Sequence, residues 1–245
     1  MAQPVIDDDP SGFLAGQVMY IDKPLRWTSF DVVKRLRAEL RRKLNMPRIK
    51  VGHAGTLDPL ATGVIIVVTG RATKQIETLQ AGVKEYVATL ALGATTPSFD
   101  LETEIDATYP TEHITRELVE NTLPQFTGHI MQVPPAFSAC KIDGIRAYQT
   151  ARTGGEVQLE AKPLKIDELE VLSFDGTSLT IRVVCSKGTY IRALARDIGK
   201  ALGSGAHLTS LRRTRVGDVT EADCLSVDQA VAWIDLQVDS NNPKV

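Results

Sequence analysis

A glycine-rich segment, GHAGTLDPLATG at residues 52–63, holds the residue types in this chain that are best suited to chemistry. It contains three glycines, one histidine (His53) and one aspartate (Asp58). An aspartate in such a loop can act as a nucleophile or a general base when its surroundings keep it ionised. Asp58 followed by Pro59 also has a simpler explanation, an N-cap aspartate with proline at the first helical position. The local sequence leaves both interpretations open.

Nucleotide-cofactor and metal chemistry have little support in the sequence. No GxxxxGK[ST] motif occurs, and the nearest approach to GxGxxG, at Gly203 and Gly205, follows an expected helix and lacks the third glycine. The three cysteines and four histidines have no metal-ligand spacing. We therefore expect no cofactor, no metal and no disulfide framework, and thiols kept in a reducing compartment.

The net charge of −2 over 245 residues argues at first against a nucleic-acid partner. Two windows, residues 34–50 and 187–215, change that interpretation, because together they carry fifteen basic residues and two acids. One basic helix alone is more simply a solvated face. Two such windows in a chain that is otherwise acidic favour a surface that binds a polyanion.

The N-terminal residues 1–15 are expected to form a flexible acidic tail, with three consecutive aspartates and no signal-peptide pattern. The longest apolar run, Val64–Val68, is too short to span a bilayer. The sequence therefore predicts a cytoplasmic protein with no membrane partner.

Hydrophobic periodicity predicts strands and helices in irregular alternation. Ser29 is the predicted N-cap of a helix over 30–44, and Ser226 of a last helix ending at Ile234. Strands are expected at 17–22, 64–70, 86–92 (buried on both faces), 164–174, 178–186 and 207–217, and further helices at 72–80, 115–126, 145–152 and 189–202. This order predicts an α+β fold with a mixed, mostly antiparallel sheet flanked by helices. The simplest division is one domain over 16–235, followed by a tail over 236–245.

Six segments in order resemble one family. They are DKP (22–24), GHAGTLDPLATG (52–63), KEYVATLALG (84–93), PPAFSACKIDG (134–144), CSKGTYIRALARDIG (185–199) and GAHLTSLRRTRVG (205–217). Together they resemble the TruB family of bacterial tRNA pseudouridine-55 synthases over residues 16–235. The resemblance implies the pseudouridine synthase fold with an RNA-binding cleft.

The resemblance also implies a reaction without a cofactor. The N1–C1′ bond of one uridine in the TΨC loop of tRNA breaks, the uracil turns over, and C5 bonds to C1′. The expected partner is the T-arm stem-loop of tRNA, with no obligate protein partner and a monomeric enzyme. Many relatives carry a C-terminal RNA-binding PUA domain, which this chain is expected to lack, so tRNA binding should depend on the two basic windows.

Two residues take catalytic roles by this resemblance. Asp58 matches the essential aspartate of the family. A buried carboxylate left alone would gain a proton, so a cation must keep it ionised. Arg192 matches the arginine that the family places against that aspartate. Without the resemblance, Arg192 would be a surface residue on the helix at 189–202.

Five further residues match family positions that bind the flipped nucleotide. Tyr86 matches the tyrosine that stacks on the base, Tyr190 a second pocket tyrosine, and Leu211 an apolar residue that closes the pocket. His53 matches a histidine that fills the space of the flipped nucleotides, and Asp100 lies near a position that contacts flipped bases. From the residues alone, Tyr86 and Leu211 would be core and His53 surface.

Two other functions stay open. One is an inactive RNA-binding protein that keeps the fold, against which the matches at Asp58, Tyr86, Tyr190 and Arg192 argue. The other is a hydrolytic glycosylase, which usually needs a second carboxylate or an activated water. Asp100, Glu102 and Glu104 could supply that carboxylate, although their acidic loop is more simply solvated.

Overall fold

The computed structural model describes residues 12–137, 141–142, 145–146 and 159–241, and it forms two compact units where the sequence predicts one domain. The first unit contains Met1–Lys84 and Arg212–Val245, and the second contains Glu85–Leu211. One division falls inside strand β12 (Ala206–Val216), and the other at the start of β4 (Lys84–Leu92). Neither position has the composition of a linker, so the sequence holds no signal of the division.

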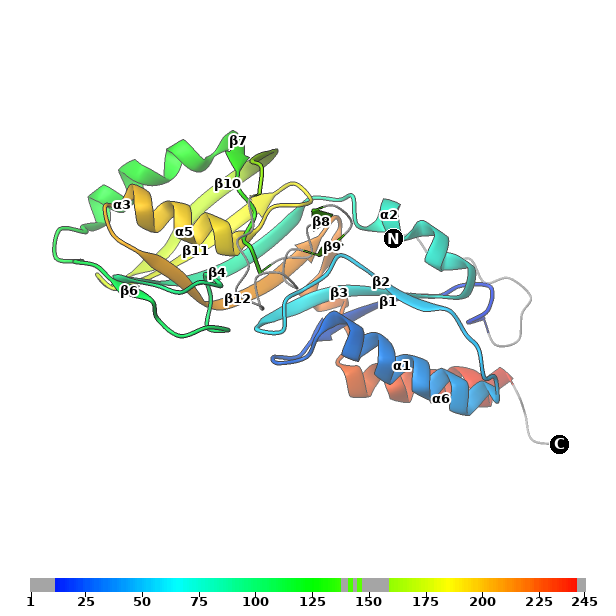
Figure 1. Ribbon diagram of the computed structural model, residues 1–245. Coiled ribbons are helices and arrows are strands. Elements are labelled where there is room, and N and C mark those ends of the chain that lie inside the picture. Colours follow the sequence, from blue (N-terminus) through cyan, green and yellow to red (C-terminus); the bar gives the residue numbers. More distant parts are fainter. Residues whose placement is uncertain (1–11, 138–140, 143–144, 147–158, 242–245) are drawn as a thin grey trace. The chain divides into compact units, whose positions relative to one another are not determined.

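The first unit is built around strand β3 (Ala61–Thr69; Figure 1). This strand is buried along almost its whole length. Strand β1 (Val18–Lys23) pairs with it antiparallel, from Val18 opposite Val68 to Lys23 opposite Gly63. Strand β2 (Val51–Ala54) pairs with the end of β3, also antiparallel. The end of β12 follows β3 in the strand order and pairs with β13 (Val219–Thr220).

Helices α1 (Ser29–Leu44) and α6 (Val227–Asn241) lie side by side in the first unit (Figure 1). The N-cap of α1 is Thr28, not Ser29 as predicted: the hydroxyl of Thr28 accepts from the Asp31 N–H, and the Asp31 carboxylate accepts from the Thr28 N–H. Ser226 caps α6 as predicted, since its hydroxyl accepts from the Gln229 N–H. The helix then continues to Asn241, so residues 236–241 are helical where a tail was expected.

Three shorter elements complete the first unit. The predicted helix at 72–80 is a 3₁₀ turn, η1 (Gly70–Gln75), followed by one α-helical turn, α2 (Ile76–Leu79), and a second 3₁₀ turn, η3, covers Glu221–Asp223. Ordered packing begins earlier than the predicted start near residue 17. Phe13 is fully buried and meets Trp233 edge to face, with ring centroids 5.6 Å apart.

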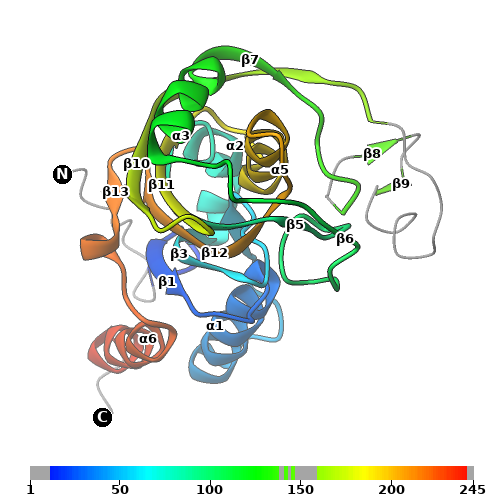
Figure 2. The same cartoon turned by 90° about the vertical axis from the view of Figure 1, so that its left-hand side faces the viewer.

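The second unit carries β12, β4, β11, β10 and β7 as sheet neighbours in that order. Strand β10 (Lys162–Phe174) pairs antiparallel with both β11 (Ser178–Cys185) and β7 (Gly128–Gln132). Helix α5 (Ile191–Ala201) packs against one face of this sheet (Figure 2). Helix α3 (Arg116–Thr122) continues into the 3₁₀ turn η2 (Leu123–Phe126), and the two together cover the helix expected at 115–126.

Two predictions for the second unit differ from the structure. Strand β4 buries Tyr86, Ala88, Leu90 and Leu92, but the residues between them are only half-buried, so just one of its faces is fully covered. The helix expected at 145–152 begins instead as strand β9 (Ile145–Arg146), paired with β8 (Lys141–Ile142), and its other residues lie outside the described ones. Strands β5 (Ala94–Thr95) and β6 (Ala107–Thr108) form a second small ladder.

The prediction of an α+β fold with a mostly antiparallel sheet is confirmed. In the part of the chain that the structure describes, no helix has both the length and the apolar character to cross a membrane.

Candidate functional site

The Asp58 side chain stands at the connection between β2 and β3 and is half-buried. The backbone turns directly after it, because the Ala61 N–H donates to the Asp58 carbonyl at 3.1 Å, and β3 begins at that residue. No helix follows Asp58–Pro59, so the N-cap interpretation of this pair is wrong. Of the two interpretations of Asp58, the functional one therefore stays open.

Ser29 holds the residue before Asp58. Its hydroxyl oxygen accepts from the Leu57 N–H at 2.8 Å and lies 3.1 Å from the Leu57 carbonyl, to which the hydroxyl donates. Both residues are buried, with 3% and 4% of their surface exposed. Ser29 has this freedom because Thr28 caps the helix in its place.

Lys23 lies next to the residue after Asp58. Its side chain is fully buried, and Nζ donates to the carbonyls of Trp27 at 2.5 Å, Pro24 at 3.0 Å and Pro59 at 3.5 Å. Burial lowers the pKa of Lys23 to about 8, while the negative charge of Asp58 acts in the opposite direction. At neutral pH the ammonium is therefore mostly protonated and lies within electrostatic reach of Asp58.

Arg213 spans the Asp58 segment from its start to its end. Its Nη2 donates to the Gly55 carbonyl at 2.9 Å and its Nε to the Val64 carbonyl at 2.8 Å, and the residue is 1% exposed. The backbone approaches closely here: a Cβ on Gly63, whose φ is +101°, would lie 2.2 Å from the Arg213 carbonyl oxygen. Only glycine fits both that conformation and that distance.

His53 lies on β2 opposite Val67. Its Nδ1 is buried and has no hydrogen-bond partner among the described residues. Burial, and then the positive charge of Arg213, lower the pKa of His53, so the ring is neutral at physiological pH. A neutral, partly buried ring fits the predicted role of filling space beside the substrate, which stays a prediction.

In the second unit, Arg192 is 4% exposed, so the surface-arginine alternative is wrong. It lies in the first turn of α5, where its Nη1 donates to the Ser98 carbonyl at 3.1 Å and its Nη2 to the Phe137 carbonyl at 2.9 Å. Its Nε is 3.5 Å from Oδ2 of Asp100. The structure thus brings two of the predicted site residues, Arg192 and Asp100, into an ion pair.

Asp100 is enclosed by its own loop and is 5% exposed. Its Oδ1 accepts from the Glu102 N–H at 2.9 Å, and its carbonyl accepts from the Thr96 hydroxyl at 2.7 Å. The expected contact between Asp100 and a flipped base stays a prediction. The carboxylate forms the ion pair with the Arg192 guanidinium.

The two predicted tyrosines occupy different surroundings. Tyr86 lies on the buried face of β4 with 8% of its surface exposed. Tyr190 precedes α5 and is half-buried, and the Gln132 side chain holds its backbone by accepting from the Tyr190 N–H at 2.9 Å and donating to its carbonyl at 3.2 Å. Leu211 is half-buried on β12.

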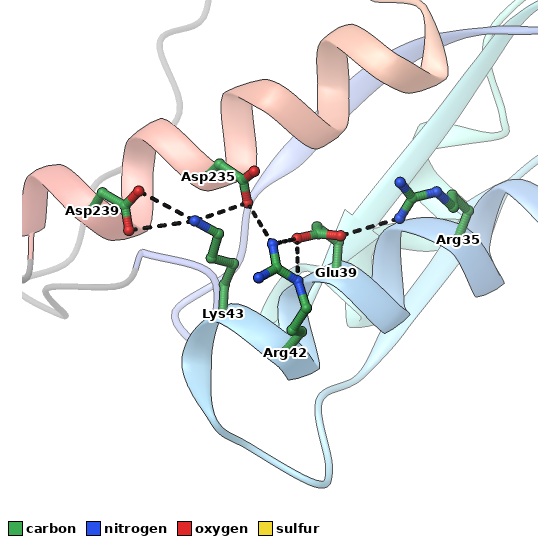
Figure 3. A network of polar contacts seen from close by, with 6 residues as sticks. All are labelled: Arg35, Glu39, Arg42, Lys43, Asp235 and Asp239. Carbon is green, nitrogen blue, oxygen red and sulfur yellow. Dashed lines mark hydrogen bonds and ion pairs between the residues drawn. The ribbon is translucent and has the colours of Figure 1, made fainter.

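The basic windows are smaller surfaces than their sequence counts imply. In the first window, Arg35 and Arg42 pair with Glu39 of α1, and Arg42 and Lys43 reach the acids of α6 (Figure 3). In the second window, Arg192 and Arg213 are buried. The exposed basic residues of both windows are Lys34, Arg41, Arg42, Arg48, Lys50, Lys187 and Lys200.

Sequence reasoning missed the three side chains that hold the Asp58 segment. One signal was present: Lys23 continues the alternation of Met19 and Ile21 on the buried face of β1, where lysine is unusual. Ser29 and Arg213 gave no such signal, since their partners lie far away in the sequence.

Comparison with known proteins matches this architecture. The TruB family pseudouridylate synthase N-terminal domain matches residues 41–191, and the tRNA pseudouridylate synthase B C-terminal domain matches residues 192–240. The tRNA pseudouridine synthase B of Phocaeicola vulgatus is 67% identical over 225 residues, which are 92% of this chain and 96% of that protein. The enzyme of the same name from Bacteroides thetaiotaomicron is 63% identical over 94% of this chain and 98% of its own length.

Solved structures agree on the fold. A Cbf5–Nop10–Gar1 complex contains a chain with a TM-score of 0.67 and 28% identity, and an archaeal box H/ACA sRNP Nop10–Cbf5 complex one with 0.64 and 27%. This chain spans 65% of the length of each, and they cover 97% and 98% of it. Fold and sequence together define a pseudouridine synthase, an isomerase. The chain belongs to the TruB family of pseudouridylate synthases.

Proposed function

We propose that this protein isomerises uridine 55 in the TΨC loop of tRNA to pseudouridine. The relatives that match 92% and 94% of this chain are both named tRNA pseudouridine synthase B. The observation that carries the proposal is Asp58 itself, a half-buried carboxylate at a turn whose backbone is held on both sides. Such an arrangement suits a group that must meet a substrate in one fixed position.

The reaction is balanced without a second substrate. The N1–C1′ bond breaks, the uracil turns over, and C5 bonds to C1′, while the proton leaves C5 and N1 gains one. Asp58 acts as the nucleophile on the sugar or the base, or as a base at the sugar, and is restored at the end. The neighbouring Lys23 ammonium favours the ionised form that either role needs.

The target base must leave the RNA stack, which costs a few kcal/mol. Stacking on an aromatic side chain returns about 1–3 kcal/mol of that cost. We assign this stacking to Tyr86, pocket contacts to Tyr190 and Leu211, and the cation of the site to Arg192, following the family resemblance. The ion pair between Arg192 and Asp100 supports a fixed guanidinium in this role.

The test is to incubate the protein with an unmodified T-arm stem-loop, digest the RNA and separate the nucleosides. The proposal predicts pseudouridine at position 55 and none when that position holds cytidine. Free uracil with an abasic site would instead identify a glycosylase, for which Glu102 and Glu104 are exposed carboxylates. Binding without any product would identify an inactive RNA-binding protein.

A further inference from the structure

We infer that Ser29 and Arg213 are positioning residues of the isomerisation, which hold the backbone of the Asp58 loop so that its carboxylate meets the target nucleotide in one place. The inference rests on the proposed function, because it assumes that Asp58 carries the chemistry. Neither side chain is offered as a group that touches the substrate.

The Ser29 hydroxyl acts on the residue immediately before Asp58. It makes two hydrogen bonds to the backbone of Leu57, one as acceptor at 2.8 Å and one as donor at 3.1 Å. The pair fixes the Leu57 peptide groups in a buried environment, where an unmatched N–H or carbonyl is costly. Movement of the chain that leads into Asp58 would break both bonds together.

Arg213 acts on a longer piece of the same loop. Its guanidinium joins the carbonyls of Gly55 and Val64, which lie before and after Asp58, and its own carbonyl lies against Gly63. Burying a cation among backbone carbonyls is an expensive way to gain stability alone, because an apolar side chain would avoid the desolvation cost. A role in fixing both ends of the Asp58 loop would explain why this desolvation cost is tolerated.

The expected consequence is kinetic. A misplacement of a reacting group by about 1 Å can lower a rate about 100-fold, while substrate contacts elsewhere are kept. A loosened Asp58 loop should therefore slow the chemical step and leave RNA affinity nearly unchanged. If the two residues had only a structural role, their substitution would lower stability without slowing the chemical step selectively over RNA binding.

The chain offers a matched control for Ser29. Thr69 is also fully buried in the first unit, and its hydroxyl also makes two backbone hydrogen bonds, accepting from the Gln17 N–H at 2.9 Å and donating to the Phe13 carbonyl at 2.8 Å. It lies at the far end of β3 from Asp58. Ser29→Ala and Thr69→Val therefore remove similar interactions from different places.

The experiment measures the single-turnover rate and the Kd on the T-arm stem-loop, at a temperature where circular dichroism shows both variants folded. Ser29→Ala should lower the rate about 10- to 100-fold, with Kd changed by less than about 3-fold, while Thr69→Val keeps a near-wild-type rate. Ser29→Cys, which keeps a weak donor and acceptor, should recover part of the loss. Equal rates for Ser29→Ala and Thr69→Val would overturn the inference for Ser29.

Arg213 is tested by a substitution that keeps the positive charge but removes the guanidinium group, which donates from two nitrogens. Lysine cannot reach two separate carbonyls as a guanidinium does. Arg213→Lys should therefore lose most of the rate with little change in Kd, and a fully active Arg213→Lys would overturn the two-ended contact. If the lysine variant does not fold, Ser29 and Thr69 still decide the inference. A wild-type protein that makes no pseudouridine would instead overturn the proposed function.

Discussion

Asp58 in the first unit and Asp100 in the second are both loop aspartates, and the sequence places both in the active site, yet the structure holds them in different ways. The bonds that fix the Asp58 loop go to its backbone, through Leu57 and the Pro59 carbonyl, and the carboxylate is half-buried. At Asp100 the contacts go to the carboxylate itself: the Glu102 N–H donates to Oδ1, Oδ2 forms an ion pair with the Arg192 guanidinium, and the residue is 5% exposed.

The two aspartates differ in how far they are exposed to a substrate. A carboxylate whose oxygens are occupied by its own loop and by a buried arginine has little capacity left for a substrate. The Asp58 loop is held through backbone groups, and Asp58 is half-buried whereas Asp100 is buried. We therefore assign chemistry to Asp58 and the orientation of Arg192 to Asp100.

The largest expected effect is that of Asp58→Asn. The substitution keeps the shape of the side chain and removes its charge, so turnover should fall by at least about 1000-fold. The midpoint of urea unfolding and the Kd for the stem-loop should change little, because the backbone contacts of the loop are untouched. Loss of folding would show instead that Asp58 is structural, and the comparison with Asp100 would fail.

Asp100→Asn should affect stability more than Asp58→Asn does. It leaves the buried Arg192 without its carboxylate partner at 3.5 Å, and we expect a loss of about 1–3 kcal/mol in the free energy of unfolding. Urea unfolding followed by circular dichroism measures this. Unchanged stability with strongly weakened RNA binding would return Asp100 to the base-contacting role that the sequence predicted.

The same distinction between exposed and enclosed groups applies to the cations. Charge reversal at an exposed residue of α1, Lys34→Glu or Arg41→Glu, should weaken stem-loop binding about 3- to 10-fold and flatten its dependence on salt. Arg182→Glu is a control, since that arginine is already paired with Glu85, Glu168 and Glu170. A salt response that is flat in the wild type would contradict a phosphate-binding surface.

The smallest effect is a pH dependence from Lys23. Burial lowers its pKa to about 8, so the ammonium loses a proton as pH rises through 8, and one of its three carbonyl contacts must weaken. The single-turnover rate should fall a few-fold above that pH, and Lys23→Met should lack this step. Stability should move the other way, because between pH 8 and 10.5 the unfolded chain binds more protons, which makes folding more favourable as pH rises. If the pH dependence of the rate were the same for the wild type and Lys23→Met, Lys23 would have no part in holding the Asp58 loop.

Local pattern predicted most elements, and contacts between distant residues account for what it missed. Strands β1, β10 and β11 and helix α5 follow the alternation and spacing of their apolar residues. At the start of α1, two adjacent hydroxyl residues could cap equally well, and the partner of Ser29 in the Asp58 loop decides between them. No local pattern contains that contact.

Contacts between distant residues also decide which charged side chains are buried. Counting them in windows treats Arg192 and Arg213 as surface cations, whereas both are buried and donate to backbone carbonyls. The identity of Asp58 came from a motif, but the reason for its position came from three side chains outside that motif. Motif resemblance therefore singled out Asp58 as the proposed catalytic group, and the fold was needed to see what holds its loop.

The most direct test of this account is a position-specific assay for pseudouridine on an unmodified T-arm stem-loop, run with the wild-type protein and with folded Asp58→Asn in parallel. We predict conversion of uridine 55 by the wild type and none by Asp58→Asn at equal occupancy of the RNA. Conversion by Asp58→Asn at a rate near that of the wild type would contradict it.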